Sequence, residues 1–146
     1  MRKLFATVCV LGLLGSQPAS ACKCAQVPTA ERYGEAKNVV LLAITETFED
    51  RVPASYIGGG MVPGKLLILR VLKVWKGSLT PGDIVYGWTL APGGACDYPH
   101  PQVGAHIILF SYESSPHEIT RCSTADPKHL ADVSSELDAI LQTMSR

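Results

Sequence analysis

The sequence contains few charged residues and no apolar segment of membrane-spanning length. Charged side chains make up 18% of the 146 residues, and 13 basic and 13 acidic residues balance to a formal net charge of zero. Without an excess of positive charge, the chain has no evident phosphate-binding surface, so nucleic acid is not an expected partner. No apolar run reaches the roughly 20 residues that a membrane-spanning helix needs, so we also expect no membrane span.

Active-site motifs of common hydrolases are absent as well. The sequence has neither Gly-x-Ser-x-Gly nor His-Glu-x-x-His, which are the patterns of serine and zinc hydrolases. The four histidines show no paired metal-ligand spacing, and they are His100, His106, His117 and His129. The triple glycine Gly58–Gly60 lacks the lysine of a phosphate-binding loop. We therefore expect neither an enzyme nor a bound cofactor.

The first 21 residues have the three parts of a secretory signal. Arg2 and Lys3 form a basic start, Leu4–Leu14 is apolar, and Ala19–Ala21 supplies small residues at the cleavage position. Cleavage after this signal makes Cys22 the first residue of a secreted or periplasmic protein. Loss of two of the 13 basic residues leaves 11 against 13 acidic ones, a net charge of −2.

A cysteine directly after a cleavage site can instead carry a lipid, as in bacterial lipoproteins. Such signals favour Leu or a similar residue three positions before the cysteine, where this chain has Ala19. Simple cleavage is therefore the preferred interpretation, and a lipid anchor at Cys22 is the alternative. The remaining residues, 22–146, are long enough for one domain with its own core.

Four of the five cysteines follow the signal, namely Cys22, Cys24, Cys96 and Cys122. An even number in a small exported domain predicts two disulfides. A Cys22–Cys24 bond would close a very tight ring, which leaves Cys22–Cys96 with Cys24–Cys122, or the swapped pairing. A four-thiolate zinc site is the less favoured alternative, because such sites more often use cysteine pairs separated by two to four residues.

Short apolar and alternating segments predict five strands. We expect these at Val39–Phe48, Lys65–Trp75, Asp83–Leu90, His106–Glu113 and His117–Cys122. The segment Glu49–Gly64 is rich in glycine and proline and predicts a mobile loop or hairpin tip. Thr29 is the expected cap of a short helix over Ala30–Lys37.

A second helix is expected at the carboxyl-terminal end of the chain. Asp126 is its predicted cap, and Pro127 takes the first helical position, where a missing N–H costs nothing. Apolar residues at helical spacing predict packing against the sheet, and they are Leu130, Val133, Leu137, Ile140, Leu141 and Met144. The expected fold is mainly β: a five-stranded OB-like β-barrel with a short N-terminal helix and a C-terminal helix.

Five short motifs follow one another in a characteristic order. They are Cys-x-Cys at 22–24, the strand Val39–Ile44, Leu-Lys-Val-Trp-Lys-Gly at 72–77, Gly-x-x-Ile-Ile-Leu-Phe at 104–110, and Thr-Arg-Cys at 120–122. This order resembles the netrin-like domain, and most closely the inhibitory domain of the tissue inhibitors of metalloproteinases in a short bacterial form. The resemblance covers the chain from Cys22 to Cys122.

The resemblance implies the pairing Cys22–Cys96 with Cys24–Cys122. It also implies that the α-amino nitrogen and the carbonyl oxygen of Cys22 chelate the catalytic zinc of a target protease, so that zinc enters only as part of that protease. The side chain of Lys23 would enter the specificity pocket of the protease. The segment Gly93, Gly94 and Ala95 would form the other half of the contact ridge.

Lys23 departs from the animal inhibitors, which carry a small or apolar residue at this position. Burying an unpaired ammonium in an apolar pocket costs several kcal/mol. The alternative interpretation is therefore a non-enzymatic interaction module of the cell envelope. In that case loops bind another secreted or envelope protein, and the disulfides only hold the terminus in place.

Overall fold

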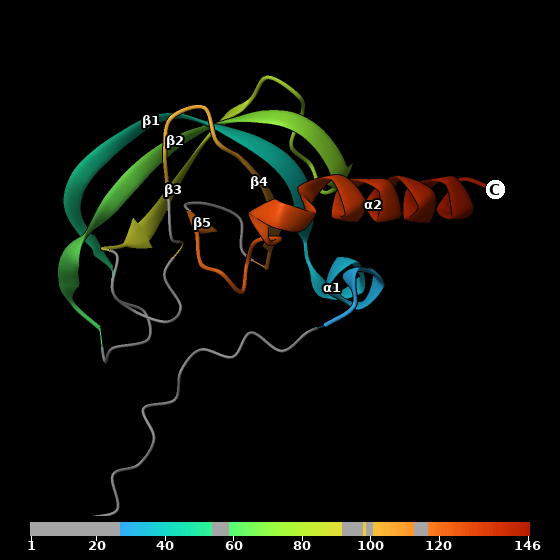
Figure 1. The fold of residues 1–146 in the computed structure, drawn as a ribbon, viewed down its shortest axis with the longest axis horizontal. Helices are drawn as coiled ribbons and strands as arrows, with labels where there is room; N and C mark the ends of the chain where they lie inside the picture. The colour runs from blue at the N-terminus through green and yellow to red at the C-terminus, as the bar shows by residue number, and fades with distance from the viewer. Residues whose placement is uncertain (1–26, 54–58, 92–97, 99–100, 113–116) are drawn as a thin grey trace, which may run out of the picture.

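The chain folds mainly into β-structure with two helices (Figure 1). The computed structural model describes residues 27–53, 59–91, 98, 101–112 and 117–146. In chain order the elements are α1 (Thr29–Glu35), β1 (Asn38–Pro53), β2 (Met61–Lys76), β3 (Ile84–Leu90), β4 (His106–Ser111), β5 (His117–Glu118), the 3-10 helix η1 (Pro127–His129) and α2 (Leu130–Met144).

Four strands form an open antiparallel sheet in the order β4-β1-β2-β3. The two-residue β5 joins β3 in parallel, with Gly87 opposite His117 and Trp88 opposite Glu118. In the described part of the chain, β4 and β5 are the two edges of this sheet. The expected closed barrel is therefore not confirmed.

Each face of the sheet packs against its own apolar cluster. Successive residues of β1 and β4 point to the two clusters in turn, because side chains alternate between the two faces of a strand. Val40 and Leu109 point into the first cluster, which the sheet encloses together with Tyr98. Val39 and Phe110 point to the opposite face and into the second cluster. Val39 and Val40 are both buried, so the first part of β1 is buried on both faces of the sheet.

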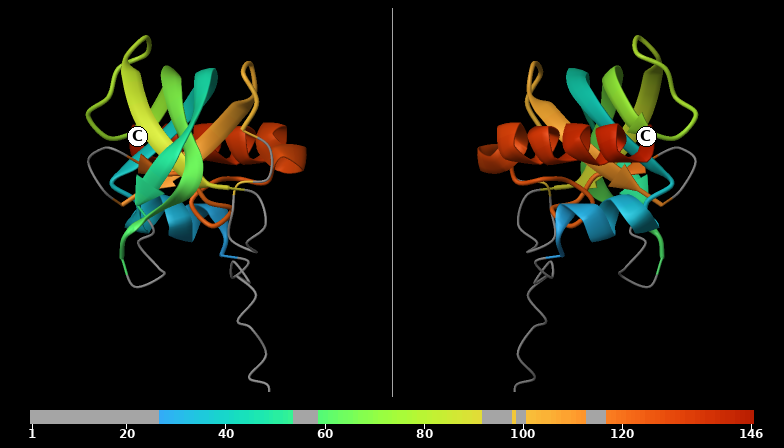
Figure 2. Two further views of the ribbon diagram at one scale, coloured as in Figure 1. Left: turned by 90° about the vertical axis from the view of Figure 1, so that its left-hand side faces the viewer. Right: turned by 90° about the vertical axis from the view of Figure 1, so that its right-hand side faces the viewer.

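We call the face of the sheet that carries Val39 and Phe110 the outer face. Helices α1 and α2 lie on this face, as Figure 2 shows, and cover the second cluster. Tyr33 of α1 and Leu137 of α2 are both buried there. Most of the predicted apolar stripe of α2 packs against this cluster, but Met144 is 69% exposed. The prediction for Met144 is wrong because α2 runs beyond the sheet before it ends (Figure 1).

The predicted mobile loop or hairpin tip over Glu49–Gly64 was drawn too long, because most of the described residues in that segment belong to the paired strands of a hairpin. β1 continues to Pro53 and β2 begins at Met61, and Glu49 pairs with Lys65 across the hairpin. Val52 is fully buried against Gly64. A Cβ at Gly64 would meet both the Val52 side chain and the carbonyl oxygen of Thr89, so here glycine permits close strand packing instead of ending the strand.

Two other boundaries differ from the prediction. Pro28, not Thr29, is the residue that precedes the first turn of α1, and no side chain caps that helix. Pairing at β5 ends at Glu118, because the chain turns immediately afterwards. At the second helix, the side chain of Asp126 accepts a hydrogen bond from the backbone N–H of Lys128, which confirms Asp126 as the cap.

Candidate functional site

Most of the residues predicted to form the site lie outside the described residues. This holds for Cys22, Lys23 and Cys24, and equally for the segment 93–96. Their mutual arrangement therefore stays a prediction. Cys122 is the one predicted disulfide cysteine that the structure describes, so the frame around Cys122 is where the site can be built from observed contacts.

Cys122 lies in a tight turn that its own neighbours stabilise. The hydroxyl oxygen of Thr120 accepts hydrogen bonds from the backbone N–H groups of Cys122 and Ser123, at 3.2 and 3.1 Å. The hydroxyl of Ser123 donates back to the carbonyl oxygen of Glu118 at 3.1 Å. Thr and Ser hydroxyls compete with strand pairing in this way, which explains why the predicted strand stops early.

Cys122 itself is exposed and disulfide-bonded. Every other cysteine of the chain lies outside the described residues. The pairing of Cys122 with Cys24 therefore stays a prediction, as the family resemblance implies.

Arg32 of α1 joins the first helix to this turn. Its guanidinium donates hydrogen bonds to the carbonyl oxygens of Cys122 and Thr124, at 2.9 and 3.1 Å. The same group lies over the ring of Phe110, 3.9 Å from the ring centroid, which adds a cation–π contact. Partial burial lowers the pKa of Arg32, and the nearby Tyr112 opposes that shift.

Two further contacts fix the position of α1 on the sheet. The hydroxyl of Tyr33 donates to the carbonyl oxygen of Trp75 at 3.0 Å, inside the second cluster. The ammonium of Lys76 donates to the carbonyl oxygens of Tyr33 and Gly34, at 2.8 and 2.9 Å. A cation near the last carbonyls of a helix is favourable, since these groups lack helical partners.

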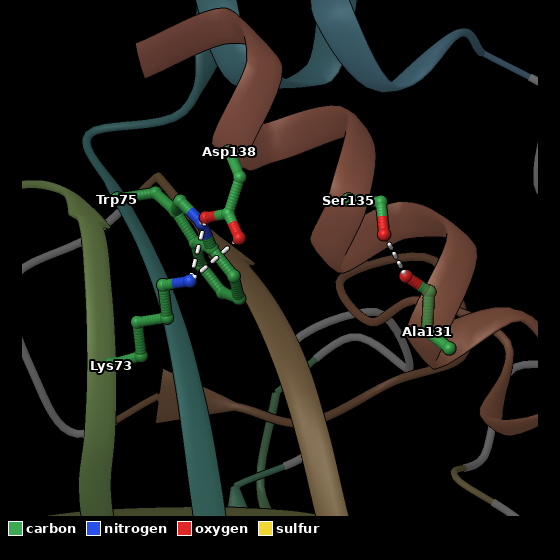
Figure 3. A network of polar contacts seen from close by, with 5 residues as sticks. All are labelled: Lys73, Trp75, Ala131, Ser135 and Asp138. Atoms are coloured by element: carbon green, nitrogen blue, oxygen red, sulfur yellow. Dashed lines mark hydrogen bonds and ion pairs between the residues drawn. The ribbon is translucent and has the colours of Figure 1, made fainter. Parts of the chain in front are cut away.

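A polar network fastens α2 to β2 (Figure 3). The carboxylate of Asp138 accepts hydrogen bonds from Lys73 Nζ, at 2.6 and 2.8 Å, and from Trp75 Nε1, at 2.7 Å. These hydrogen bonds, first that of Lys73 and then that of Trp75, hold the pKa of Asp138 below its usual value. Ser135, one turn earlier, donates only to the carbonyl of Ala131 within the helix.

The described residues on either side of 92–97 are also held in place. Ala91, just after β3, donates from its backbone N–H to the carbonyl oxygen of Pro63 at 3.2 Å. Tyr98 is buried in the first cluster, and its backbone N–H donates to the hydroxyl of Thr89 at 3.3 Å. Burial raises the pKa of Tyr98. Ala91 and Tyr98, the described residues that flank the predicted ridge segment, are thus both anchored.

A small cavity of about 180 Å³ borders the turn. Its lining includes Phe110, Ser111, Glu118 and Thr120. Sites for small molecules are usually larger, about 300–1,000 Å³, so this cavity does not indicate a small-molecule substrate. Among the described residues, no group of three or more His, Cys, Asp or Glu side chains is placed to hold a metal ion.

Sequence reasoning missed three of the residues that organise this frame. Asp138 and Lys73 did leave a signal, because each places a charge of opposite sign within an apolar stripe, one on a helix and one on a strand. Arg32 left none, since its two acceptors are backbone carbonyls about 90 residues away in the sequence. Contacts to distant backbone carry no compositional pattern.

No known protein-family model matches this sequence, and a search of curated proteins finds no match. The family resemblance therefore depends on the order of motifs alone.

Within the described part of the chain, no helix is both long enough and apolar enough to cross a membrane.

Proposed function

We propose that the chain is an exported inhibitor of zinc endopeptidases that acts through its processed amino terminus, as the resemblance to the tissue inhibitors of metalloproteinases implies. The proposal takes Cys22 as the first residue and pairs it with Cys96, while Cys24 pairs with Cys122. The disulfide at Cys122 supports the use of these cysteines as cross-links.

One observation carries the proposal: the hydrogen bonds from Arg32 to the turn that contains Cys122. Helix α1 begins at Thr29, five residues after Cys24. With the proposed Cys24–Cys122 disulfide, the amino-terminal segment is tied to this turn at one end by a covalent bond and at the other by Arg32. A terminus ordered in advance loses less conformational entropy when it binds.

The chemistry of the terminus suits a catalytic zinc. Such a zinc keeps one coordination position open for water or substrate. The α-amine and carbonyl of Cys22 could displace the water as a five-membered chelate. An α-amino group has a pKa of about 7.7–8.0, so a substantial neutral fraction is present near neutral pH. Lys23 would then point into the specificity pocket, beside Gly93–Ala95.

The proposal includes an OB-like barrel, closed between β4 and the residues that follow β5. It is supported by an antiparallel bridge between Leu109 and Thr124. Two backbone hydrogen bonds flank this bridge, from Phe110 N–H to the Ser123 carbonyl at 2.8 Å and from Ala125 N–H to the Ile108 carbonyl at 3.0 Å. These bonds connect the two edge regions of the sheet next to the Cys122 turn.

The proposal is tested with mature protein purified from an exporting host. Intact mass must first give a chain that starts at Cys22, with no lipid and no free thiol. The protein is then titrated against a panel of zinc endopeptidases, and we expect stoichiometric inhibition of at least one of them. A diacylglycerol adduct on Cys22, or four titratable thiols, would contradict the terminus mechanism.

The second candidate function is an interaction module of the cell envelope. An apolar area on the exposed outer face of β1, β2 and β3 favours it, because such areas mark contact surfaces. The two functions separate at the terminus: acetylation of Cys22 removes inhibition but leaves binding through the sheet unchanged.

A further inference from the structure

The outer face of the sheet is only half covered by helices. At the end near Val39 and Trp75, α1 and α2 pack on it. At the other end, β1, β2 and β3 carry large apolar side chains on the same face, where neither of the two described α-helices packs. We call this set the outer patch, and it consists of Phe48, Leu66, Ile68, Ile84, Tyr86 and Trp88.

Strand register makes the outer patch continuous. Leu66 lies between Phe48 and Trp88 in one cross-strand row. Ile68 pairs with Tyr86 in the next row. Residues in such rows are direct neighbours, because paired strands lie about 4.8 Å apart.

Several patch residues are strongly exposed. Tyr86 is 59% exposed, Phe48 48%, Ile84 45% and Leu66 37%. The solvent face of an antiparallel sheet is normally polar, since its inner face already supplies the core. An exposed apolar outer face therefore indicates a surface that binds a partner.

Two charged residues lie in the same set of cross-strand rows. Glu46 pairs with Ile68 across β1 and β2, and Arg70 pairs with Ile84 across β2 and β3. Both side chains are exposed, and neither forms an ion pair with another described residue. The patch thus presents one negative and one positive group, on neighbouring strands and in neighbouring rows.

We propose that the outer patch binds a second copy of this chain about a two-fold axis. The axis lies in the plane of the interface and passes beside Ile68 and Tyr86. Within the cross-strand rows, it exchanges the positions of Glu46 and Arg70. Each Glu46 then faces Arg70 of the second copy, so one symmetry operation forms two ion pairs across the interface. The same axis brings Phe48 close to Ile84 of the second copy.

Charge complementarity is the reason for choosing a second copy over an unrelated partner. The same axis pairs the two opposite charges and brings apolar residues of the two copies together. The face is therefore complementary to itself. A standard interface involves about 20–30 residues on each partner, whereas the outer patch has six apolar residues and two charged neighbours. The dimer is therefore reversible and depends on concentration. This inference is independent of the terminus mechanism.

Sedimentation equilibrium of the mature protein, from about 10 µM to about 1 mM, tests the proposal in the range where small interfaces dissociate. The wild type shows a concentration-dependent dimer. E46R and R70E each weaken dimerisation at least tenfold, because each leaves two like-charged pairs facing each other. E136R, on the exposed face of α2, is the matched control and dimerises as the wild type does. Circular dichroism checks that all variants are folded.

Mixing gives the decisive result. E46R presents two positive groups and R70E two negative ones, so an equimolar mixture restores both pairs and forms a heterodimer, although each variant alone dimerises at least tenfold more weakly than the wild type. The double variant E46R/R70E dimerises again. A wild type that stays monomeric throughout overturns the proposal. So does a mixture that fails to associate, or single variants that dimerise like the wild type.

Discussion

The side chain of Arg32 donates a hydrogen bond of 2.9 Å to the backbone carbonyl of Cys122, across 90 positions of sequence. Helix α1 is therefore connected directly to the turn that carries a disulfide-bonded cysteine. Since α1 follows the predicted mature terminus by a few residues, this hydrogen bond limits where the terminus can lie. The proposed inhibitory mechanism needs such a limit.

The first prediction concerns Arg32. Arg32→Met keeps much of the apolar contact with Phe110 but removes the donors to the carbonyls of Cys122 and Thr124. Hydrogen bonds from a charged donor contribute about 1.5–3 kcal/mol each when buried, and less when partly exposed. We expect a loss of about 1–3 kcal/mol in the free energy of unfolding, measured by urea denaturation. Lys128→Met, at an exposed position, is the control and should change little; equal effects of the two would contradict the assignment.

The second prediction is a pH dependence at Asp138. Its pKa is lower in the folded protein than the ordinary value of 3.8. Its contribution to stability is therefore fully present above about pH 4 and is lost as the pH falls through the lowered folded pKa. Asp138→Asn should lower the melting temperature at pH 7, and the difference from the wild type should shrink in strong acid. Glu136→Gln is the control, and a difference that is constant with pH would refute the ion-pair account.

The third prediction concerns the disulfide at Cys122. If it joins Cys24, the closed loop spans most of the mature chain, and the chain-entropy model gives at most about 4–5 kcal/mol of stabilisation. The double replacement Cys24→Ser with Cys122→Ser should lower the melting temperature markedly. It should leave one disulfide, detectable by mass before and after reduction. An unchanged melting temperature would show that this pairing is absent or unimportant.

The positions of the main strands were predictable because their apolar pattern is local. Val39 and Val40 pack into opposite clusters, as a run of adjacent apolar residues predicts. The helix cap at Asp126 was predictable for the same reason, since Asp126 and the backbone N–H of Lys128 that donates to it are two residues apart.

The predictions that failed did so for two reasons, a distant contact at Gly64 and local side-chain hydrogen bonds after β5. Gly64 indicated a loop, but its missing side chain lets Val52 pack below the backbone of a neighbouring strand. Thr120 and Ser123 ended a predicted strand through hydrogen bonds between their hydroxyls and nearby backbone groups. In the candidate site, Cys122 was found from the sequence, whereas the role of Arg32 needed three-dimensional coordinates.

The fourth prediction concerns the specificity position. Lys23→Thr removes an ammonium whose desolvation in an apolar pocket costs several kcal/mol. Because about 1.4 kcal/mol corresponds to a tenfold change in affinity, inhibition of proteases with apolar pockets should improve by at least tenfold. Inhibition constants of both forms against the same panel measure this. Weaker inhibition by Lys23→Thr would instead indicate a pocket with an acidic partner for Lys23.

The most direct test of the inhibitory mechanism is one alanine added before Cys22. The addition converts the proposed chelating amine into an amide and places an extra residue in front of the zinc, while the rest of the chain is unchanged. Inhibition constants of the native and extended proteins are measured against one protease that the native protein inhibits, and melting temperatures are compared as the control for folding. The account predicts that the extended protein melts as the native one does and no longer inhibits. Equal inhibition by the two proteins would contradict it.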